Sequence, residues 1–408
     1  MAQATAIDKR TRAPHPVLLG LAIGLVAANL RPALASVGPV LTDLRTSLGL
    51  SGAEASALTA APVLCLGAAA AAAPALARRW GMEPVIAAIL AVIGAGLLLR
   101  VGGGTTVLFA GTVLASGAIA IANVLLPAII KRDFTQGSGT MMGVYSMALT
   151  GSAAVAAGAT VPIGDALRLG WQGALGAWAL PAVVALLGWL PFTRSRHSPP
   201  ASRTSEGSLL RDPLAWQVTV FFGLQSLSFY AVLAWLPSIY RDHGYSAAAA
   251  GLLLSTSVLV QIPISLVLPS LAARMPAQRA LIAGATLVTI VGLAGVLLAP
   301  TAAPYLWVLL VGVGQGSAFP LGLTLFVLRT RTTADTARLS AMAQTCGYLI
   351  AASGPLLVGT VHDATRSWTP AIALLLLLAV PQLVTGVLAG RNRYVGPAQQ
   401  PSPHRPGS

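Results

Sequence analysis

The first long apolar segment of the chain contains one full charge, Arg31, within the stretch VAANLRPALASVGPV (residues 26–40). No acidic residue lies within ten positions of Arg31 on either side. A charge at the centre of a membrane helix costs about 2.5–3.5 kcal/mol on insertion scales, so it is usually kept for function. Arginine stays protonated, and its planar fork can hold a planar anion through two hydrogen bonds. We therefore expect Arg31 to bind the negative charge of a substrate.

A structural role for Arg31 is the alternative. The side chain could bond backbone carbonyls at a helix break made by Pro32, or near the end of another helix. Helical spacing also places Gly20 and Gly24 on the same stripe as Arg31, and small residues there allow close packing or leave a cavity. Asn29 lies on another face and is a candidate for a hydrogen bond between helices.

The other polar residues deep in the apolar segments are amides and phenols. We expect five of them to line a central cavity: Gln225, Tyr230, Gln261, Gln315 and Tyr348. Asn123 and Gln344 are further candidates for substrate binding. A neutral polar cavity with one arginine suits a small, polarisable, weakly acidic solute, whereas a large lipophilic cation would require a carboxylate. For each residue the alternative is a hydrogen bond between helices, worth roughly 0.6 kcal/mol.

Acids and histidines are absent from the middle of the apolar segments. The eleven Asp and Glu and the five His all lie in loops, tails or segment ends. Coupling to a proton or another ion would therefore require Glu54, His362 or the substrate itself. No cluster of catalytic groups, metal ligands or cofactor motif is present, which argues against an enzyme. No Walker motif occurs, which argues against ATP-driven transport.

The composition indicates the elements that must hold these residues. The chain is 55% hydrophobic and 9% charged, whereas soluble domains average about 25% charged residues. The net charge of +14 could suggest nucleic acid, but the charges fall in short loops between apolar segments, so we expect the lipid bilayer as partner instead. A membrane span needs about 20 apolar residues. Twelve are predicted, at 16–37, 53–75, 83–100, 106–130, 139–162, 171–192, 214–238, 246–271, 279–299, 304–328, 337–361 and 368–389.

The twelve spans divide into two similar sets of six. MALTGSAAVAAG at Met147 resembles MAQTCGYLIAASG at Met342, and Trp171 and Trp368 open spans six and twelve. The number of residues between the two members of each pair is nearly constant, which indicates a duplicated six-helix unit. Such a plan places a substrate site between the halves. We therefore predict an all-α membrane fold. Its parts are an N-terminal bundle (1–192), a cytoplasmic linker (193–212), a C-terminal bundle (213–392) and a disordered tail (393–408).

Lysine and arginine alternate between the two sides of the predicted spans. With the N-terminus inside, 19 of the 25 fall in cytoplasmic segments and five in external loops. Cytoplasmic loops of membrane proteins carry this excess, so both termini are predicted to be cytoplasmic, in the plasma membrane. The first apolar segment is too long for a signal-peptide core, and we expect it to remain as a helix. We expect a monomer.

Several quoted stretches resemble one transporter family. Twelve spans in two sets of six with a basic central loop resemble the major facilitator superfamily. NLRPALASVGPVL, NVLLPAIIKRDF, FFGLQSLSFYAVLAWLPSIYRDHG, GQGSAFPLGLTL and AQTCGYLIAASGPLLVG resemble its cyanate-permease and nitroimidazole-transporter family. The loop ALARRWGMEPV departs from the superfamily pattern, because it keeps Arg78, Arg79 and Gly81 but lacks the usual Asp. The resemblance therefore does not carry over the charge relay of that loop.

The resemblance implies a secondary active transporter that works by alternating access. Its substrate would be a small anion or a weakly acidic or nitro-bearing solute, similar to cyanate or a nitroimidazole. A multidrug-type efflux carrier for neutral, drug-like compounds is the alternative within transport. A membrane sensor or enzyme is the alternative outside it, but a sensor usually has an added soluble domain and the loops here are short.

Overall fold

The computed structural model describes residues 16–193 and 208–396, and these residues form helices and no strand. Eleven helices are long and apolar enough to cross a membrane. The pair Glu54–Ala70 and Ala73–Trp80, bent by 52° at its break, makes a twelfth span. The predicted all-α fold with twelve spans is confirmed. Most of the predicted linker and tail (194–207 and 397–408) lies outside the described residues.

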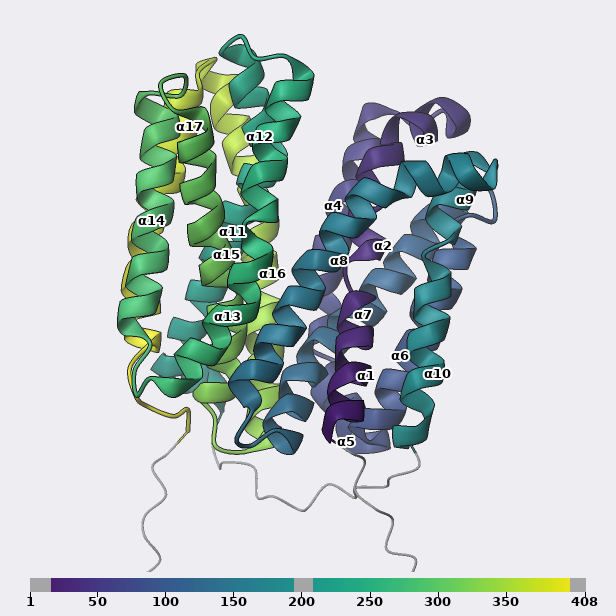
Figure 1. Ribbon diagram of the computed structural model, residues 1–408, viewed down its shortest axis with the longest axis vertical. Helices are drawn as coiled ribbons and strands as arrows, with labels where there is room; N and C mark the ends of the chain where they lie inside the picture. The colour runs from purple at the N-terminus through teal and green to yellow at the C-terminus, as the bar shows by residue number, and fades with distance from the viewer. Residues whose placement is uncertain (1–15, 194–207, 397–408) are drawn as a thin grey trace, which may run out of the picture.

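The helices form two groups that lie side by side (Figure 1). The first bundle consists of α1 (Pro16–Ala28), α2 (Pro32–Ala35), the 3₁₀ helix η1 (Gly38–Val40), α3 (Leu41–Leu48), α4 (Gly52–Ala70), α5 (Ala73–Trp80), α6 (Met82–Leu99), α7 (Thr105–Asp133), α8 (Ser138–Leu167), α9 (Gly170–Gly176) and α10 (Ala179–Thr193). The second bundle consists of the 3₁₀ helix η2 (Leu209–Arg211), α11 (Pro213–Asp242), α12 (Ala247–Leu259), α13 (Gln261–Arg274), α14 (Arg279–Leu298), α15 (Pro304–Leu328), α16 (Thr333–Thr365) and α17 (Trp368–Ala389).

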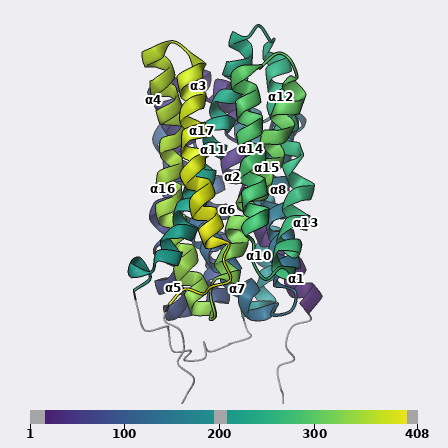
Figure 2. The ribbon, with the colours of Figure 1, turned by 90° about the vertical axis from the view of Figure 1, so that its left-hand side faces the viewer.

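The long helices run roughly parallel to the long axis of the molecule (Figure 2). The molecule therefore has two ends, which are named here by the helices that lie at each. The end at which α1 and α11 begin and α10 stops is called the linker end, and it is the lower end in Figure 1. The opposite end, where α3 and α9 lie, is called the far end.

Prolines determine where two of the spans break. Proline lacks an N–H, and its ring clashes with the carbonyl four residues earlier. α1 ends at Ala28, four residues before Pro32, and α12 ends at Leu259, four residues before Pro263. Between α1 and α2 the chain turns through Asn29, Leu30 and Arg31. The predicted first span (16–37) is therefore broken before Pro32, and Arg31 lies in the break.

The two bundles contact each other near the linker end and diverge toward the far end (Figure 1). α8 packs on α13, while α4 and α7 pack on α16. Gly139 and Gly143 of α8 lie against the backbone of α13, and a Cβ at Gly143 would overlap the carbonyl oxygen of Leu266. Close approach of the backbones is therefore possible only because these positions are glycine.

An ion pair that the sequence pattern did not predict lies next to the turn between α5 and α6. Glu83, at the start of α6, pairs with Arg132 at the end of α7. Arg132 also pairs with the adjacent Asp133, at 2.7 Å between Nε and Oδ1. Glu83 therefore supplies a carboxylate at this end of the first bundle, although the loop lacks the usual Asp.

The end of the described chain packs against the second bundle. The backbone N–H of Val395 donates to the carbonyl of Arg329 at 2.8 Å, and that of Gly396 donates to the carboxylate of Asp212 at 2.6 Å. Val395 is buried. The sequence predicts a disordered tail from residue 393, but these contacts hold residues 393–396 against α11 and α15.

Candidate functional site

Arg31 lies at the boundary between the two bundles. It is partly buried in the break between α1 and α2, and its Nη1 donates to the hydroxyl of Tyr230 on α11 at 3.3 Å. Its guanidinium lies over the ring of Phe319 on α15, with 5.3 Å from Cζ to the ring centroid. It also interacts electrostatically with the hydroxyls of Tyr348 and Tyr145. The break therefore directs the charge of the first bundle toward the second.

The partners of Arg31 are all neutral. Within residues 16–193 and 208–396, no carboxylate forms an ion pair with Arg31 and no backbone carbonyl accepts from its side chain. An arginine carries five N–H donors, and phenol hydroxyls do not neutralise its charge. Among the described residues, the charge of Arg31 therefore has neutral hydrogen-bonding and aromatic partners only.

Three further polar side chains, on α7, α8 and α16, are linked to one another near Arg31. The hydroxyl of Tyr145 on α8 donates to Oδ1 of Asn123 on α7 at 3.1 Å. Nε2 of Gln344 on α16 donates to the backbone carbonyl of Asn123 at 3.0 Å, across the bundle boundary. Nδ2 of Asn123 and Oε1 of Gln344 are buried without a hydrogen-bond partner. An unmet hydrogen bond on a buried polar group costs about 1–3 kcal/mol, so a solute that satisfied these atoms would be favoured.

Aromatic rings pack around the same place. Tyr348 meets Phe222 edge-on, with 5.4 Å between ring centroids, and Phe222 lies 6.1 Å from Phe319. These rings give one side of the site a flat, polarisable and apolar surface. Seven residues from both bundles therefore form what is called here the central cluster: Arg31, Asn123, Tyr145, Tyr230, Phe319, Gln344 and Tyr348.

Three predicted site residues bond within the second bundle instead. Gln225 donates to the carbonyl of Phe222 and to the hydroxyl of Ser226. Gln261 donates to the carbonyl of Ser257 across the break between α12 and α13. Gln315 donates to the hydroxyl of Ser228 at 3.3 Å, which links α15 to α11. All three glutamines are buried. Only the bond of Gln315 joins two helices, as the alternative role expects, whereas Gln225 and Gln261 bond within their own spans.

The structure places three other residues that were singled out in the first span. Gly20 and Gly24 face Met141 and Val144 of α8, and with these residues they line a pocket between α1 and α8. Nδ2 of Asn29 donates to the carbonyl of Leu25 in its own helix at 2.8 Å, so its hydrogen bond does not join two helices. The stripe that was expected to carry Arg31 therefore ends before it.

Arg100, the last residue of the predicted span 83–100, is buried. It is 1% exposed and follows the last turn of α6. Its guanidinium donates to the carbonyl of Ala33 at 2.8 Å, to the hydroxyl of Ser36 at 3.1 Å and to the carbonyl of Leu175 at 3.2 Å. These are the carbonyl bonds at the break that the structural alternative assigned to Arg31. Arg100 therefore holds α2 in place through hydrogen bonds. In the sequence, only its position at the end of an apolar segment could have indicated that it is buried.

The described residues do not gather side chains of the kinds that bind metals. No set of three His, Cys, Asp or Glu side chains comes together among residues 16–193 and 208–396. Cys65 and Cys346 are free thiols. The central cluster therefore offers an arginine, amides, phenols and a phenyl ring, which suit binding of a small polar solute.

Comparison with known proteins agrees with this arrangement. The sequence pattern of the Major Facilitator Superfamily matches residues 18–355. The chain is 39% identical to an uncharacterized transporter, YycB, of Bacillus subtilis (strain 168), over 91% of this chain and 92% of the relative. It is 37% identical to the 2-nitroimidazole transporter of Escherichia coli (strain K12), over 93% of this chain and 97% of the relative. It is 33% identical to the cyanate transport protein CynX of the same organism, over 85% and 91%.

A solved structure supports the same fold. The proton:xylose symporter XylE superposes with a TM-score of 0.73 at 13% identity, over 93% of this chain and 97% of that chain. With the family pattern matched over most of the sequence and twelve spans in two bundles, the chain belongs to the major facilitator superfamily of membrane transporters.

Proposed function

We propose that this transporter moves a small anion, or a weakly acidic or nitro-bearing solute, with Arg31 as the electrostatic anchor. One observation carries the proposal. Arg31 lies between the two bundles, and the described residues provide it with neutral hydroxyls and a phenyl ring but no carboxylate. A negative or partly negative solute would supply the missing partner, held by a charge-assisted hydrogen bond.

The names of two relatives support the same chemistry. One is a 2-nitroimidazole transporter and the other a cyanate transport protein. A nitro group carries partial negative charge on the oxygens of a planar frame, and cyanate is a small linear anion. The ring of Phe319 beside Arg31 and the unpartnered amide of Asn123 suit such a frame, because one stacks on it and the other donates to it. A carrier of large neutral compounds would not need a charge between the bundles.

We infer that the linker end faces the cytoplasm and that the protein resides in the plasma membrane as a monomer. The excess of lysine and arginine in the segments at the linker end supports this orientation. In this structure the bundles meet at the linker end, so the state would be outward-facing. Transport would then proceed by rocking of residues 1–192 against 213–392 around the central cluster, with 193–212 as the linker.

The test compares Arg31→Ala and Arg31→Lys with Arg241→Ala, an exposed arginine at the far end of α11. Purified proteins are tested for binding of cyanate and 2-nitroimidazole by thermal shift, because binding to the folded state raises the melting temperature. Uptake into proteoliposomes is measured in parallel. Loss of a hydrogen bond to a charged group is worth about 1.5–3 kcal/mol, so affinity should fall about 10- to 150-fold in Arg31→Ala.

The two Arg31 variants separate binding from structure. Arg31→Lys should bind weakly, since it keeps the charge but loses the planar fork. Arg241→Ala should bind normally. If Arg31→Ala elutes as a folded monomer and still binds with wild-type affinity, Arg31 is structural and the proposal fails. If neither solute binds the wild-type protein but a neutral, drug-like compound does, the efflux alternative replaces it.

A further inference from the structure

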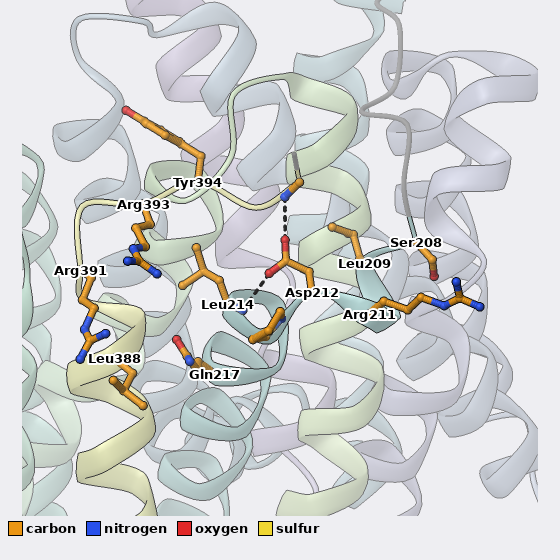
Figure 3. A pocket seen from close by; sticks show the side chains of 12 residues that line it. Ser208, Leu209, Arg211, Asp212, Leu214, Gln217, Leu388, Arg391, Arg393 and Tyr394 are labelled. Carbon is orange, nitrogen blue, oxygen red and sulfur yellow. Dashed lines mark hydrogen bonds between the residues drawn. The ribbon is translucent and has the colours of Figure 1, made fainter. Parts of the chain in front are cut away.

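A pocket of about 560 Å³ lies at the linker end of the second bundle, and no residue of the central cluster lines it (Figure 3). Its walls come from η2, the first turns of α11, the end of α17 and residues 391–396. Three arginines line it: Arg211, Arg391 and Arg393. Gln217 and Tyr394 add an amide and a phenol hydroxyl. The pocket therefore combines positive charge with neutral hydrogen-bonding groups.

The positive charge of the pocket is not neutralised by the described residues. Asp212 is the one acidic residue in the lining, and its carboxylate already accepts from the backbone N–H groups of Leu214, Ala215 and Gly396. Within 16–193 and 208–396, no ion pair involves any of the three pocket arginines. Nε of Arg391 is buried without a hydrogen-bond partner. An anion held by the exposed donors of these arginines would neutralise the charge.

Arg391 and Arg393 belong to a C-terminal segment that is held in place. Gln278 donates from its backbone N–H to the carbonyl of Gly390 at 2.9 Å, and Val395 donates to that of Arg329 at 2.8 Å. The guanidinium of Arg331 lies over the ring of Tyr394, at 5.1 Å. In Figure 3, Arg391 and Arg393 lie on the same side of the pocket as Gln217, while Arg211 lies on the other side. The two C-terminal arginines are therefore positioned together by contacts outside the pocket.

The position of the pocket indicates what kind of anion it takes. The apolar spans α11 and α17 begin and end at its edge, which places it at the level of the lipid headgroups. Leu214 and Leu388 form part of its wall. The neighbouring Leu210 and Trp216 expose 64% and 40% of their surface, and Trp216 is a typical residue of the membrane interface. A ligand with a phosphate and an attached apolar part fits these surroundings better than a free anion.

We propose that this pocket binds the phosphate of an anionic phospholipid in the leaflet at the linker end. Arg391 and Arg393 hold the phosphate oxygens, Gln217 bonds the rest of the headgroup, and the acyl chains extend past Leu388 into the bilayer. Basic pockets at this depth are suited to such headgroups. The site does not depend on the identity of the transported solute.

The test uses the full-length protein in detergent and native mass spectrometry. Phosphatidylglycerol is titrated against the wild type, the double variant Arg391→Gln/Arg393→Gln and the control Arg78→Gln/Arg79→Gln. The control removes the same charge from exposed positions near the linker end of the first bundle. Each arginine near an anionic lipid is worth about a fivefold change in binding, so the pocket variant should bind about 25-fold more weakly. The control should change by less than about twofold.

Two further measurements decide the outcome. Phosphatidylcholine, which is neutral overall, should bind equally and weakly to all three proteins. Inorganic phosphate should leave the melting temperature of the wild type unchanged at millimolar concentration; a rise that is lost in the pocket variant would assign the pocket to a soluble phosphate and overturn the lipid proposal. Equal phosphatidylglycerol binding by the pocket variant and the control would also overturn it. Arg391→Lys/Arg393→Lys keeps the charge and should bind phosphatidylglycerol. This result would show that lost charge, and not misfolding, explains weak binding by the glutamine variant.

Discussion

Lys131 of the first bundle caps the end of a helix in the second. Its Nζ donates to the carbonyl of Thr330 at 2.9 Å and to that of Val327 at 3.0 Å. The last carbonyls of α15 have no partner within their own helix, and the C-terminal end of a helix dipole attracts a cation. The bond therefore joins the bundles at the linker end through a charge and free backbone acceptors.

Lys131→Met should open the linker end. Loss of a charged hydrogen bond of about 1.5–3 kcal/mol would raise the population open at that end by roughly 10-fold or more. Spin labels on α8 and α13 would report the change as longer distances. Arg274→Gln removes an exposed charge from the linker end of α13 and should leave the distances unchanged. An unchanged distance distribution in Lys131→Met would show that packing alone closes this end.

Gly143→Ala should also open the linker end, for a steric reason. A Cβ at Gly143 would overlap the backbone carbonyl of Leu266 on α13, and backbone on both sides cannot yield without separating the bundles. The same helix offers matched controls, because a Cβ at Gly151 or Gly158 meets nothing within 4 Å. Either control substitution should leave transport near wild type, whereas Gly143→Ala should slow it several-fold. Equal transport rates in all three variants would contradict this contact.

Arg100→Gln should weaken both the fold and the central cluster. Its side chain holds the carbonyls of Ala33 and Leu175, and removal would leave these buried acceptors unpaired, at about 1–3 kcal/mol each. The melting temperature should fall, and solute affinity should fall with it, because α2 follows directly after Arg31. Arg45→Gln, at an exposed position in α3, should change neither. A lower melting temperature with full affinity would limit Arg100 to a structural role.

Glu83→Gln should destabilise the first bundle. Arg132 pairs with Glu83 and Asp133, and loss of one carboxylate leaves a largely buried guanidinium with a single charged partner. We expect a loss of about 1–2 kcal/mol in the free energy of unfolding. A double-mutant cycle with Arg132→Gln measures the coupling between the two residues. A coupling near zero would mean that Glu83 contributes through its helix alone.

The sequence determined the spans, their number and the choice of Arg31. Apolar segments of about 20 residues must cross the bilayer, because a membrane offers no water to unpaired backbone groups. An arginine without a nearby acid is conspicuous in such a segment, so Arg31 could be singled out by type and position. The prolines also indicated breaks. However, Pro32 and Pro263 interrupt their spans, whereas Pro127 and Pro320 lie inside continuous helices.

Tertiary structure decided which polar residues share a site. Gln315 and Gln344 look alike in the sequence, yet one bonds Ser228 within its own bundle and the other bonds Asn123 across the boundary. Arg100 and Lys131 lie at the ends of predicted spans, where charges are ordinary, yet one is buried against α2 and the other caps α15. Such roles depend on the rotation of each helix about its axis and on contacts between residues that are 67 to 221 positions apart. Hydrophobicity along the chain fixes the depth of a residue in the membrane, but packing between helices fixes the direction in which its side chain points.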